Sequence, residues 1–225
     1  MRVLAIDTAL EACAAAVLDT ERGGLANESL PMVRGHAEAL MPLVARVMAQ
    51  ANAQFADLDR IAVTIGPGSF TGLRVGIAAA RGISLAARRP SVGLSTLAAF
   101  AAPYIAHDDS TAVTVAIDAR HDHVYLQVFG PGGRTLVAPR IAGVRDAARI
   151  SANGPARIVG SGAQMLAAAW PADEPAPKVV DVQSAPDIKW VARLGAAATS
   201  TGAPRPLYLR QPDAQPQDAA RLPRR

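Results

Sequence analysis

The order of expected secondary-structure elements occurs twice in this chain, and this repeat restricts the possible folds more than any other feature. Hydrophobic periodicity and turn residues predict a first series of strands at 2–6, 10–18 and 25–33, a helix at 36–51, a strand at 61–65, a helix at 72–87, a strand at 91–94 and a helix at 95–101. A second series follows, with strands at 111–117, 124–129 and 134–137, a helix at 144–150, a strand at 157–159, a helix at 163–170, a strand at 178–182 and a helix at 186–199. Each first strand ends in the tripeptide Ala-Ile-Asp, at Asp7 and at Asp118. We infer two copies of one structural unit.

The order of elements in each copy predicts a sheet with both parallel and antiparallel strands. Strands joined by short turns pair antiparallel, whereas strands joined through a helix lie parallel. We therefore expect an α/β fold with two mixed five-stranded sheets, flanking helices, and a cleft between the two halves. The expected domains are residues 1–106 and 107–202, followed by a Pro/Arg-rich tail at 203–225. Pro31 predicts an edge strand, Pro42 a kink or a late helix start, and Pro103 a helix end.

Composition narrows the class of protein. Half of the 225 residues are hydrophobic and 4% are aromatic, which predicts a closely packed, helix-rich core. The net charge is +4, but residues 203–225 carry five Arg and two Asp, so the rest of the chain is nearly neutral. A general nucleic-acid-binding face is not supported, whereas contact of the basic tail with phosphate stays open. The single Cys13 excludes an internal disulfide, and no signal peptide or transmembrane segment is expected, so we predict a cytoplasmic protein with no membrane contact.

A glycine-rich stretch follows the strand at 61–65. Gly66-Pro-Gly68 predicts a tight turn, and Ser69 is a residue type that caps helix starts. Free backbone N–H groups at such a helix start favour either an anion or a closely approaching chain. No lysine of a phosphate-binding loop follows, and Gly68, Gly72 and Gly76 recur every fourth residue, which favours close packing. The packing partner is either the helix at 36–51, from the same chain or from another, or the helix's own sheet.

Several motifs together resemble the bacterial TsaB (YeaZ) family. They are Ala5-Ile-Asp-Thr8, His36-Ala-Glu-Ala-Leu-Met-Pro42, Gly66-Pro-Gly-Ser-Phe-Thr-Gly-Leu-Arg74, Asp118-Ala-Arg120 and Tyr208-Leu-Arg210. The resemblance covers residues 3–210 and implies an actin-like (ASKHA) fold of two ribonuclease-H-like domains. It also implies a non-catalytic scaffold subunit of the complex that makes N6-threonylcarbamoyladenosine next to the anticodon of tRNAs reading ANN codons. The implied partners are a TsaD-like transferase in a heterodimer, a TsaE-like ATPase, and a second copy of the chain in a homodimer, with tRNA contacted indirectly or through the basic tail.

Two sets of site residues follow from these patterns. We expect a helical partner-binding surface made of His36, Leu40, Leu43, Val44, Val47, Phe70, Gly72, Arg74, Val75, Gly76, Ala79 and Ala80. Asp7, Thr8, Asp118, Gly160 and Gly162 correspond to a nucleotide site, which we interpret as vestigial. Actin-like enzymes need glycine-rich hairpins beside such aspartates, whereas side chains follow both of them here. We therefore expect no intrinsic cofactor, and ATP or ADP with Mg²⁺ only within a complex.

Catalytic and metal-binding alternatives have weaker support. The TsaD paralogue carries a His-x-x-x-His pair, whose places are taken here by Thr96 and Phe100. His121 and His123 are interpreted as solvated loop residues, and no metal site is predicted. Ser69 lacks the Gly-x-Ser-x-Gly context of a nucleophile elbow. A stand-alone ATPase or phosphotransferase stays as the alternative function, and a peptidase ranks last.

Overall fold

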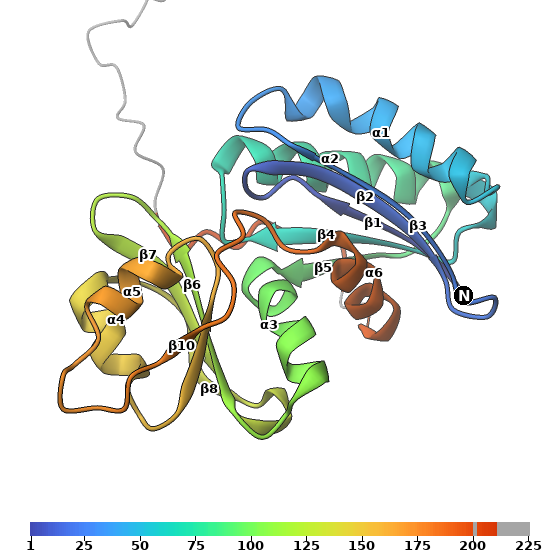
Figure 1. The fold of residues 1–225 in the computed structure, drawn as a ribbon. Coiled ribbons are helices and arrows are strands. Elements are labelled where there is room, and N and C mark those ends of the chain that lie inside the picture. The colour runs from blue at the N-terminus through green and yellow to red at the C-terminus, as the bar shows by residue number, and fades with distance from the viewer. Residues whose placement is uncertain (200–201, 211–225) are drawn as a thin grey trace, which may run out of the picture.

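The structure, a computed structural model, describes residues 1–199 and 202–210 and contains two five-stranded mixed sheets (Figure 1). The first half consists of β1 (Arg2–Asp7), β2 (Ala12–Asp19), β3 (Gly24–Pro31), α1 (His36–Gln50), a 3-10 turn η1 (Phe55–Asp57), β4 (Arg60–Gly66), α2 (Phe70–Ala87), β5 (Ser91–Ser95) and α3 (Thr96–His107). The second half consists of β6 (Ala112–Asp118), β7 (His123–Phe129), a 3-10 turn η2 (Pro131–Gly133), β8 (Thr135–Gly143), α4 (Val144–Ser151), β9 (Ala156–Val159), α5 (Ala163–Ala168), β10 (Lys178–Val179) and α6 (Ile188–Ala197).

The two sheets have the same topology. The strand order is β3-β2-β1-β4-β5 in the first and β8-β7-β6-β9-β10 in the second. In each sheet the first three strands pair antiparallel and the last two join in parallel. Asp7 and Asp118 both end the central strand of their sheet, as the repeated tripeptide predicts. The predicted α/β fold with two mixed five-stranded sheets and flanking helices is confirmed.

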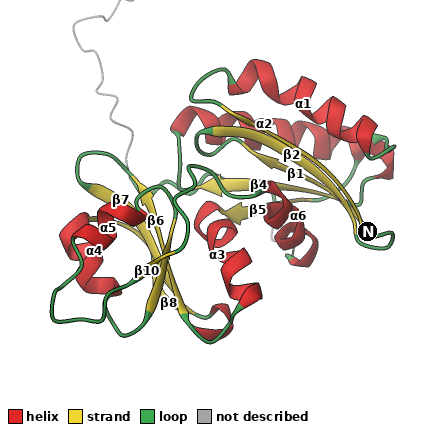
Figure 2. Ribbon diagram, in the orientation of Figure 1, coloured by secondary structure: helices red, strands yellow, loops and turns green. Residues whose placement is uncertain are grey.

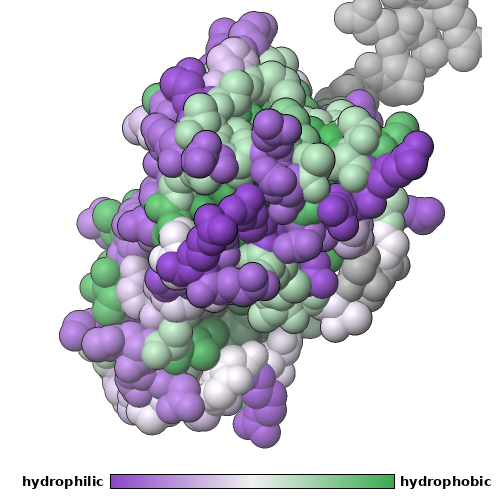
Figure 3. Space-filling view, turned by 90° about the vertical axis from the view of Figure 1, so that its right-hand side faces the viewer, coloured by the Kyte–Doolittle hydropathy of each residue, from purple (hydrophilic) through white to green (hydrophobic). Residues whose placement is uncertain are grey.

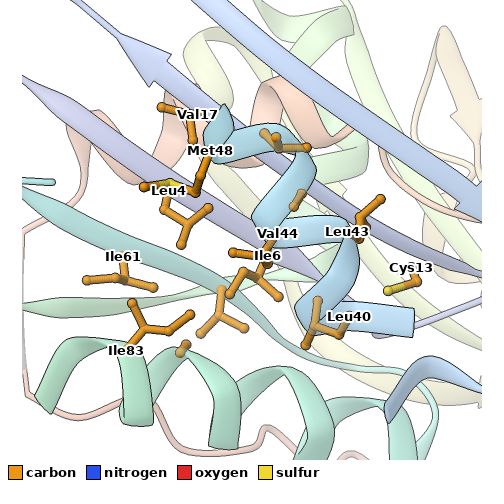
Figure 4. Packing of buried hydrophobic residues seen from close by; sticks show 14 of the residues in the cluster. Leu4, Ile6, Cys13, Val17, Leu40, Leu43, Val44, Met48, Ile61 and Ile83 are labelled. Atoms are coloured by element: carbon orange, nitrogen blue, oxygen red, sulfur yellow. The ribbon is translucent and has the colours of Figure 1, made fainter. Parts of the chain in front are cut away.

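Helices α1 and α2 cover one face of the first sheet (Figures 1 and 2). Successive strand residues point to opposite faces, so Leu4 and Ile6 of β1 face these helices. Leu40 and Val44 of α1 meet them in one buried cluster, which Figure 4 shows at close range. At about 25 cal/mol per Å² of apolar surface removed from water, this burial is the main favourable term in holding the layer together.

The opposite face of the first sheet is covered by α6, although this helix comes from the end of the chain. Alanines at positions such as Ala5 and Ala62 keep this face flat, and Gly195 of α6 rests directly on Ala62. The predicted domain division placed the helix at 186–199 in the second half, whereas in the structure it packs on the first sheet. The helix can approach closely because the facing side chains are small.

The second sheet is covered on both faces in the same manner. Helices α4 and α5 pack on one face, and α3, from the first half, packs on the other. Leu97 and Phe100 of α3 meet Val113 and Val115 of β6 in a buried cluster. The two halves therefore exchange a helix, and α3 and α6 touch where they cross.

Proline effects differ in part from the expectations. Pro103 does not end its helix, since α3 continues to His107. Proline has no backbone N–H and so removes one helical hydrogen bond, but the helix continues on both sides of it. Strand β8 runs through Pro139 to Gly143, which an edge strand tolerates because its outer N–H groups need no partner. Strand β3 lies at the edge of its sheet as Pro31 predicts, but it ends at Pro31 and does not continue to residue 33. In the part of the chain that the structure describes, no helix has the length and apolar character needed to cross a membrane.

Candidate functional site in the cleft between the two sheets

Asp7 and Asp118 occupy equivalent turns. The Asp7 carboxylate accepts hydrogen bonds from the backbone N–H of Ala9 at 3.1 Å and from the Thr64 hydroxyl. The Asp118 carboxylate accepts one from the backbone N–H of Arg120 at 2.7 Å. Asp7 is fully buried, whereas Asp118 is exposed. The same residue type thus holds the same turn in both halves, but in two different environments.

The glycine stripe of α2 closes over the first turn. A Cβ on Gly72 would overlap the carbonyl oxygen of Thr8, and one on Gly76 would overlap the Thr8 hydroxyl. Gly68 stands equally close to the carbonyl oxygen of Ala9. The proposed packing against the helix at 36–51 is therefore wrong, because the stripe contacts the β1–β2 turn of its own sheet. The space that a phosphate group would need beside this turn is filled by backbone.

The second turn is closed by an equivalent segment. The N–H of Gly162 donates to the carbonyl oxygen of Ala116 at 2.9 Å, and a Cβ on Gly160 would lie 2.5 Å from the same oxygen. The Ser161 hydroxyl accepts a hydrogen bond from the N–H of Asp118 at 3.0 Å. The residues predicted as a vestigial nucleotide site therefore form two separate closed turns, with Asp7 and Thr8 in one and Asp118, Gly160 and Gly162 in the other.

Burial governs the electrostatics of the first turn. One carboxylate oxygen of Asp7, Oδ2, has no hydrogen-bond partner within the described residues. Desolvation raises the pKa of Asp7, and the hydrogen bonds from Thr64 and Ala9 and the charge of His36 oppose this only in part. His36, the first residue of α1, contacts the turn, since its Nε2 lies 3.0 Å from the carbonyl oxygen of Leu10.

A cavity of about 370 Å³ lies between the two turns. The first half contributes Glu11, Ser69 and Phe70, the second contributes Asp118, Arg120 and Tyr125, and the segment 207–210 forms a further wall. The Phe70 and Tyr208 rings stack with centroids 5.2 Å apart, and the Arg74 guanidinium lies 3.8 Å from the Phe70 centroid. The cavity lining therefore combines aromatic rings from both halves with acidic side chains and the cationic Arg120 and Arg210.

The family model described as "TsaD: tRNA N6-adenosine threonylcarbamoyltransferase" matches residues 20–181 of this chain. An uncharacterized protein of Mycobacterium tuberculosis is 35% identical over 217 residues, which cover 95% of this chain and 94% of that protein. The tRNA threonylcarbamoyladenosine biosynthesis protein TsaB of Escherichia coli is 39% identical over 125 residues, 56% of this chain. That match spans 53% of the E. coli protein, about half of its length. The solved structure of YeaZ from Pseudomonas aeruginosa has a TM-score of 0.77 at 26% identity and covers 92% of this chain and 99% of its own.

The chain belongs to the family that the TsaD model describes, and within it to the TsaB (YeaZ) group. The crystal structure of the ethanolamine utilization protein EutJ from Carboxydothermus hydrogenoformans, at 13% identity and a TM-score of 0.51, shares the fold alone. This likeness agrees with the actin-like fold that the sequence predicts.

Most residues predicted for a partner surface are buried in this TsaB-family chain. The buried ones are His36, Leu40, Leu43, Val44, Val47, Gly72, Gly76 and Ala80. The apolar stripe of α1 faces its own sheet, so its helical periodicity reports the core and not an interface. Phe70 and Arg74 are exposed, and Val75 and Ala79 are half-buried. Sequence reasoning missed the exposed hydrophobic side chains Met41 and Leu85, because a single apolar residue on a polar helix face carries no periodic signal.

The residues considered for metal binding and nucleophilic chemistry are buried, exposed and scattered, or used to cap a helix. Thr96 and Phe100 are buried in α3, whereas His121 in the β6–β7 turn and His123 at the start of β7 are exposed. Within residues 1–199 and 202–210 no group of three or more His, Cys, Asp or Glu side chains could hold a metal ion. The Ser69 hydroxyl caps α2 by accepting a hydrogen bond from the N–H of Gly72 at 3.3 Å. This capping engages the atom that a peptidase would use as its nucleophile.

A second hollow, of about 490 Å³, lies at the far end of the first sheet. Arg2, Asp19, Arg22 and Gln50 line it, and the Arg2 Nε donates to Asp19 at 3.0 Å. Figure 3 shows this side of the molecule, where hydrophilic and hydrophobic residues are interspersed. The hollow contains none of the sequence-predicted site residues, and its Arg2 and Asp19 side chains form an ion pair with each other.

Proposed function

We propose that this chain is a non-catalytic subunit of a tRNA N6-threonylcarbamoyladenosine modification complex, in which it binds and activates a TsaD-like transferase. Relatives from E. coli and Haemophilus influenzae bear the name tRNA threonylcarbamoyladenosine biosynthesis protein TsaB, which supports this pathway. The proposed target is the adenosine next to the anticodon of tRNAs reading ANN codons. The observation that carries the non-catalytic role is the closure of both aspartate turns by glycine segments.

This closure argues against phosphoryl transfer by the chain alone. Catalysis of that reaction depends on backbone N–H groups and cations that surround the phosphates. Here the carbonyl oxygen of Thr8 meets Gly72, and the carbonyl oxygen of Ala116 meets Gly160. Hydrogen-bond acceptors therefore pack at the places where a phosphate would need hydrogen-bond donors. Asp7, fully buried, cannot reach a substrate. Mg-ATP hydrolysis by the isolated chain, abolished in Asp118→Ala, would contradict the non-catalytic assignment.

The proposed transferase-binding surface is the outer face of α1 and α2. These two helices pack side by side on the first sheet and turn their other face outward (Figures 1 and 2). Met41 is 46% exposed and Leu85 is 82% exposed, with small exposed residues such as Ala45 and Ala78 between the larger ones. Exposed apolar side chains among small residues suit close packing of a partner's helices. This surface replaces the buried residues that the sequence suggested.

Further partners belong to the same proposal. A TsaE-like ATPase joins the heterodimer, and ATP or ADP with Mg²⁺ binds only within the assembled complex. In the absence of the transferase, the same helical face pairs with a second copy of the chain. Contact of the basic residues beyond 210 with tRNA concerns residues outside those that the structure describes.

Co-expression with the transferase of the same organism tests the proposal. Met41→Glu and Leu85→Glu place a charge in the proposed interface, and we expect loss of co-purification and of tRNA modification. Val182→Glu is the matched control, because Val182 is 50% exposed but lies in the second half, and it should bind normally. Thermal unfolding checks that all three variants fold. A complex that survives both interface changes would exclude this surface, and modification that proceeds without the chain would exclude the function.

A further inference from the structure

Residues 204–210, here called the C-terminal strap, cross the mouth of the cleft. They follow α6 in the chain and run in Figure 1, in red, from the end of β4 toward the second sheet. The sequence placed this segment in a Pro/Arg-rich tail, although Leu207 and Leu209 alternate with polar positions as in an extended, half-buried segment. The structure gives the strap specific contacts with both halves.

The first half holds the strap through backbone and aromatic contacts. The N–H of Leu207 donates to the carbonyl oxygen of Ile65 at 2.7 Å, as in an added strand. The carbonyl oxygen of Leu207 lies so close to Gly66 that a Cβ there would stand 2.7 Å away. Tyr208 stacks on Phe70 at the start of α2, and its hydroxyl accepts a hydrogen bond from Arg74 Nε at 3.2 Å.

The second half holds the next two residues of the strap. The side chain of Leu209 packs against the apolar cluster of α3 and β6, which includes Phe100 and Val115. Arg210 donates from Nη1 to the carbonyl oxygen of Ala119 at 3.0 Å, in the turn that follows Asp118. Four consecutive residues, 207–210, therefore bind both walls of the cleft.

We propose that the C-terminal strap fixes the distance between the two halves of this protein. At the base of the cleft, the crossing helices α3 and α6 join the halves, and such a crossing permits rotation of one half against the other. The strap joins the halves at the mouth, where rotation would separate Ile65 from Ala119 and break its contacts. The chain itself thereby supplies the closure that a bound ligand provides in hinged two-domain proteins.

The strap also connects the cleft with the outer start of α2. Arg74 lies on the exposed side of that helix and contacts both Phe70 and Tyr208. Release of the strap would therefore remove the Tyr208 partner of Arg74 and alter the surface at the start of α2. The proposal about the strap does not depend on the proposed function, because it concerns only the internal geometry of the chain.

A distance measurement in the full chain tests the strap. Spin labels are attached at Val33→Cys in the first half and Gln164→Cys in the second, both exposed positions, while the native Cys13 is fully buried. The distance distribution is recorded by pulsed electron resonance for the otherwise unchanged chain, for Leu209→Ala combined with Arg210→Ala, and for Arg205→Ala. Arg205 is the matched control, because it is an exposed strap residue that forms no hydrogen bond or ion pair within the described residues. Hydrogen exchange of the Leu207 amide reports in parallel whether the strap stays docked.

We expect a narrow distribution for the unchanged chain and for Arg205→Ala. The Leu209→Ala/Arg210→Ala variant should show a broader distribution and Leu207 exchange about tenfold faster or more. An unchanged distribution in that variant would overturn the proposal, whether or not the Leu207 amide exchanges faster. If the double variant does not fold, Tyr208→Ala replaces it, because this side chain is 41% exposed and its removal leaves the core intact. A narrow distribution in Tyr208→Ala with fast Leu207 exchange would overturn the proposal equally.

Discussion

The hydroxyl of Thr8 donates a hydrogen bond to the carbonyl oxygen of Gly72 at 2.7 Å, in the buried contact between the β1–β2 turn and the first turn of α2. The bond joins residues 64 positions apart. It forms only because Gly72 and Gly76 have no side chains, so that the helix backbone reaches the turn. The glycine stripe is thus required by the packing of the first half.

The first prediction concerns Gly72→Ala. The added methyl group would overlap the carbonyl oxygen of Thr8, which is backbone and cannot rotate away, so the helix must shift. We expect a decrease of about 1–3 kcal/mol in the free energy of unfolding, the usual cost of overpacking. Urea unfolding measures it.

Gly82→Ala provides the control within the same helix. Nothing lies within 4 Å of a Cβ at Gly82, which is exposed. Alanine should stabilise the helix there by about 0.4–1 kcal/mol, because it restricts the unfolded chain. Destabilisation of similar size at both positions would show that the contact with Thr8 is not the cause.

The second prediction concerns the pH dependence contributed by Asp7. Its pKa is raised in the folded state by burial, so between the unfolded and folded pKa values the folded protein binds more protons. The free energy of unfolding must therefore fall as the pH rises above the ordinary Asp pKa of about 3.9. Asn is isosteric with the neutral acid and does not titrate, so Asp7→Asn should gain stability relative to the unchanged chain between pH 4 and pH 7.

Denaturant unfolding at both pH values measures this difference. Asp118→Asn is the matched control, because it makes the same exchange in the equivalent but exposed turn. A stability difference for Asp7→Asn that is the same at pH 4 and pH 7 would show that folding does not raise the pKa of this carboxyl.

The sequence predicted the fold well because the repeat is local. Strand and helix signals depend on neighbouring residues, and the Ala-Ile-Asp tripeptide marked equivalent strand ends at Asp7 and Asp118. The exchange of α3 and α6 between the sheets depends on side-chain volume in a distant part of the chain, such as Ala62 under Gly195. Hydrophobic periodicity carries no information about such a contact, so α6 was assigned to the second half although it packs on the first sheet.

The candidate site was predicted only in part, because local residue patterns do not show which distant segment covers a residue. The turns at Asp7 and Asp118 were interpreted as unlike phosphate-binding hairpins because side chains follow both aspartates, whereas the structure closes the turns by backbone contact with Gly72 and Gly160. Val44 and Gly76 were assigned to an interface, but an amphipathic stripe looks the same whether a sheet or a partner covers it. The strap was missed because Leu207 and Tyr208 meet their partners, Ile65 and Phe70, only when folding brings the first half of the chain beside them.

The third prediction concerns Arg60, which joins the first sheet to the end of α6. Its guanidinium Nη1 donates to the carbonyl oxygens of Gly195 at 2.8 Å and Ala196 at 3.1 Å, and also to that of Ala198. These carbonyls end the helix and have no partner within it, and the cation faces the negative end of the helix dipole. Arg60→Met keeps the aliphatic stem, and we expect a loss of about 1.5–3 kcal/mol from the missing charged hydrogen bonds.

Trp190 in α6 reports this loss, since it is half-buried and its fluorescence follows undocking of the helix. Arg81→Met is the control, an exposed arginine on α2 for which stability should change by less than about 0.5 kcal/mol. Equal effects at Arg60 and Arg81 would indicate that the loss of a positive charge, and not the helix end, is responsible.

The fourth prediction concerns Cys13, the single cysteine of the chain, which is fully buried in β2. Burial, with a smaller contribution from the nearby Asp7 carboxyl, raises the pKa of the Cys13 thiol to about 11. At pH 8 only about a thousandth of the thiol is ionised, and the thiolate is the form that reacts. We expect a thiol reagent to modify the folded protein only at the rate of its opening. Leu40→Ala, which removes a fully buried side chain of α1 from the same core, should accelerate modification, whereas Arg205→Ala should not. Rapid modification of the unchanged protein at pH 8 would contradict the burial of Cys13.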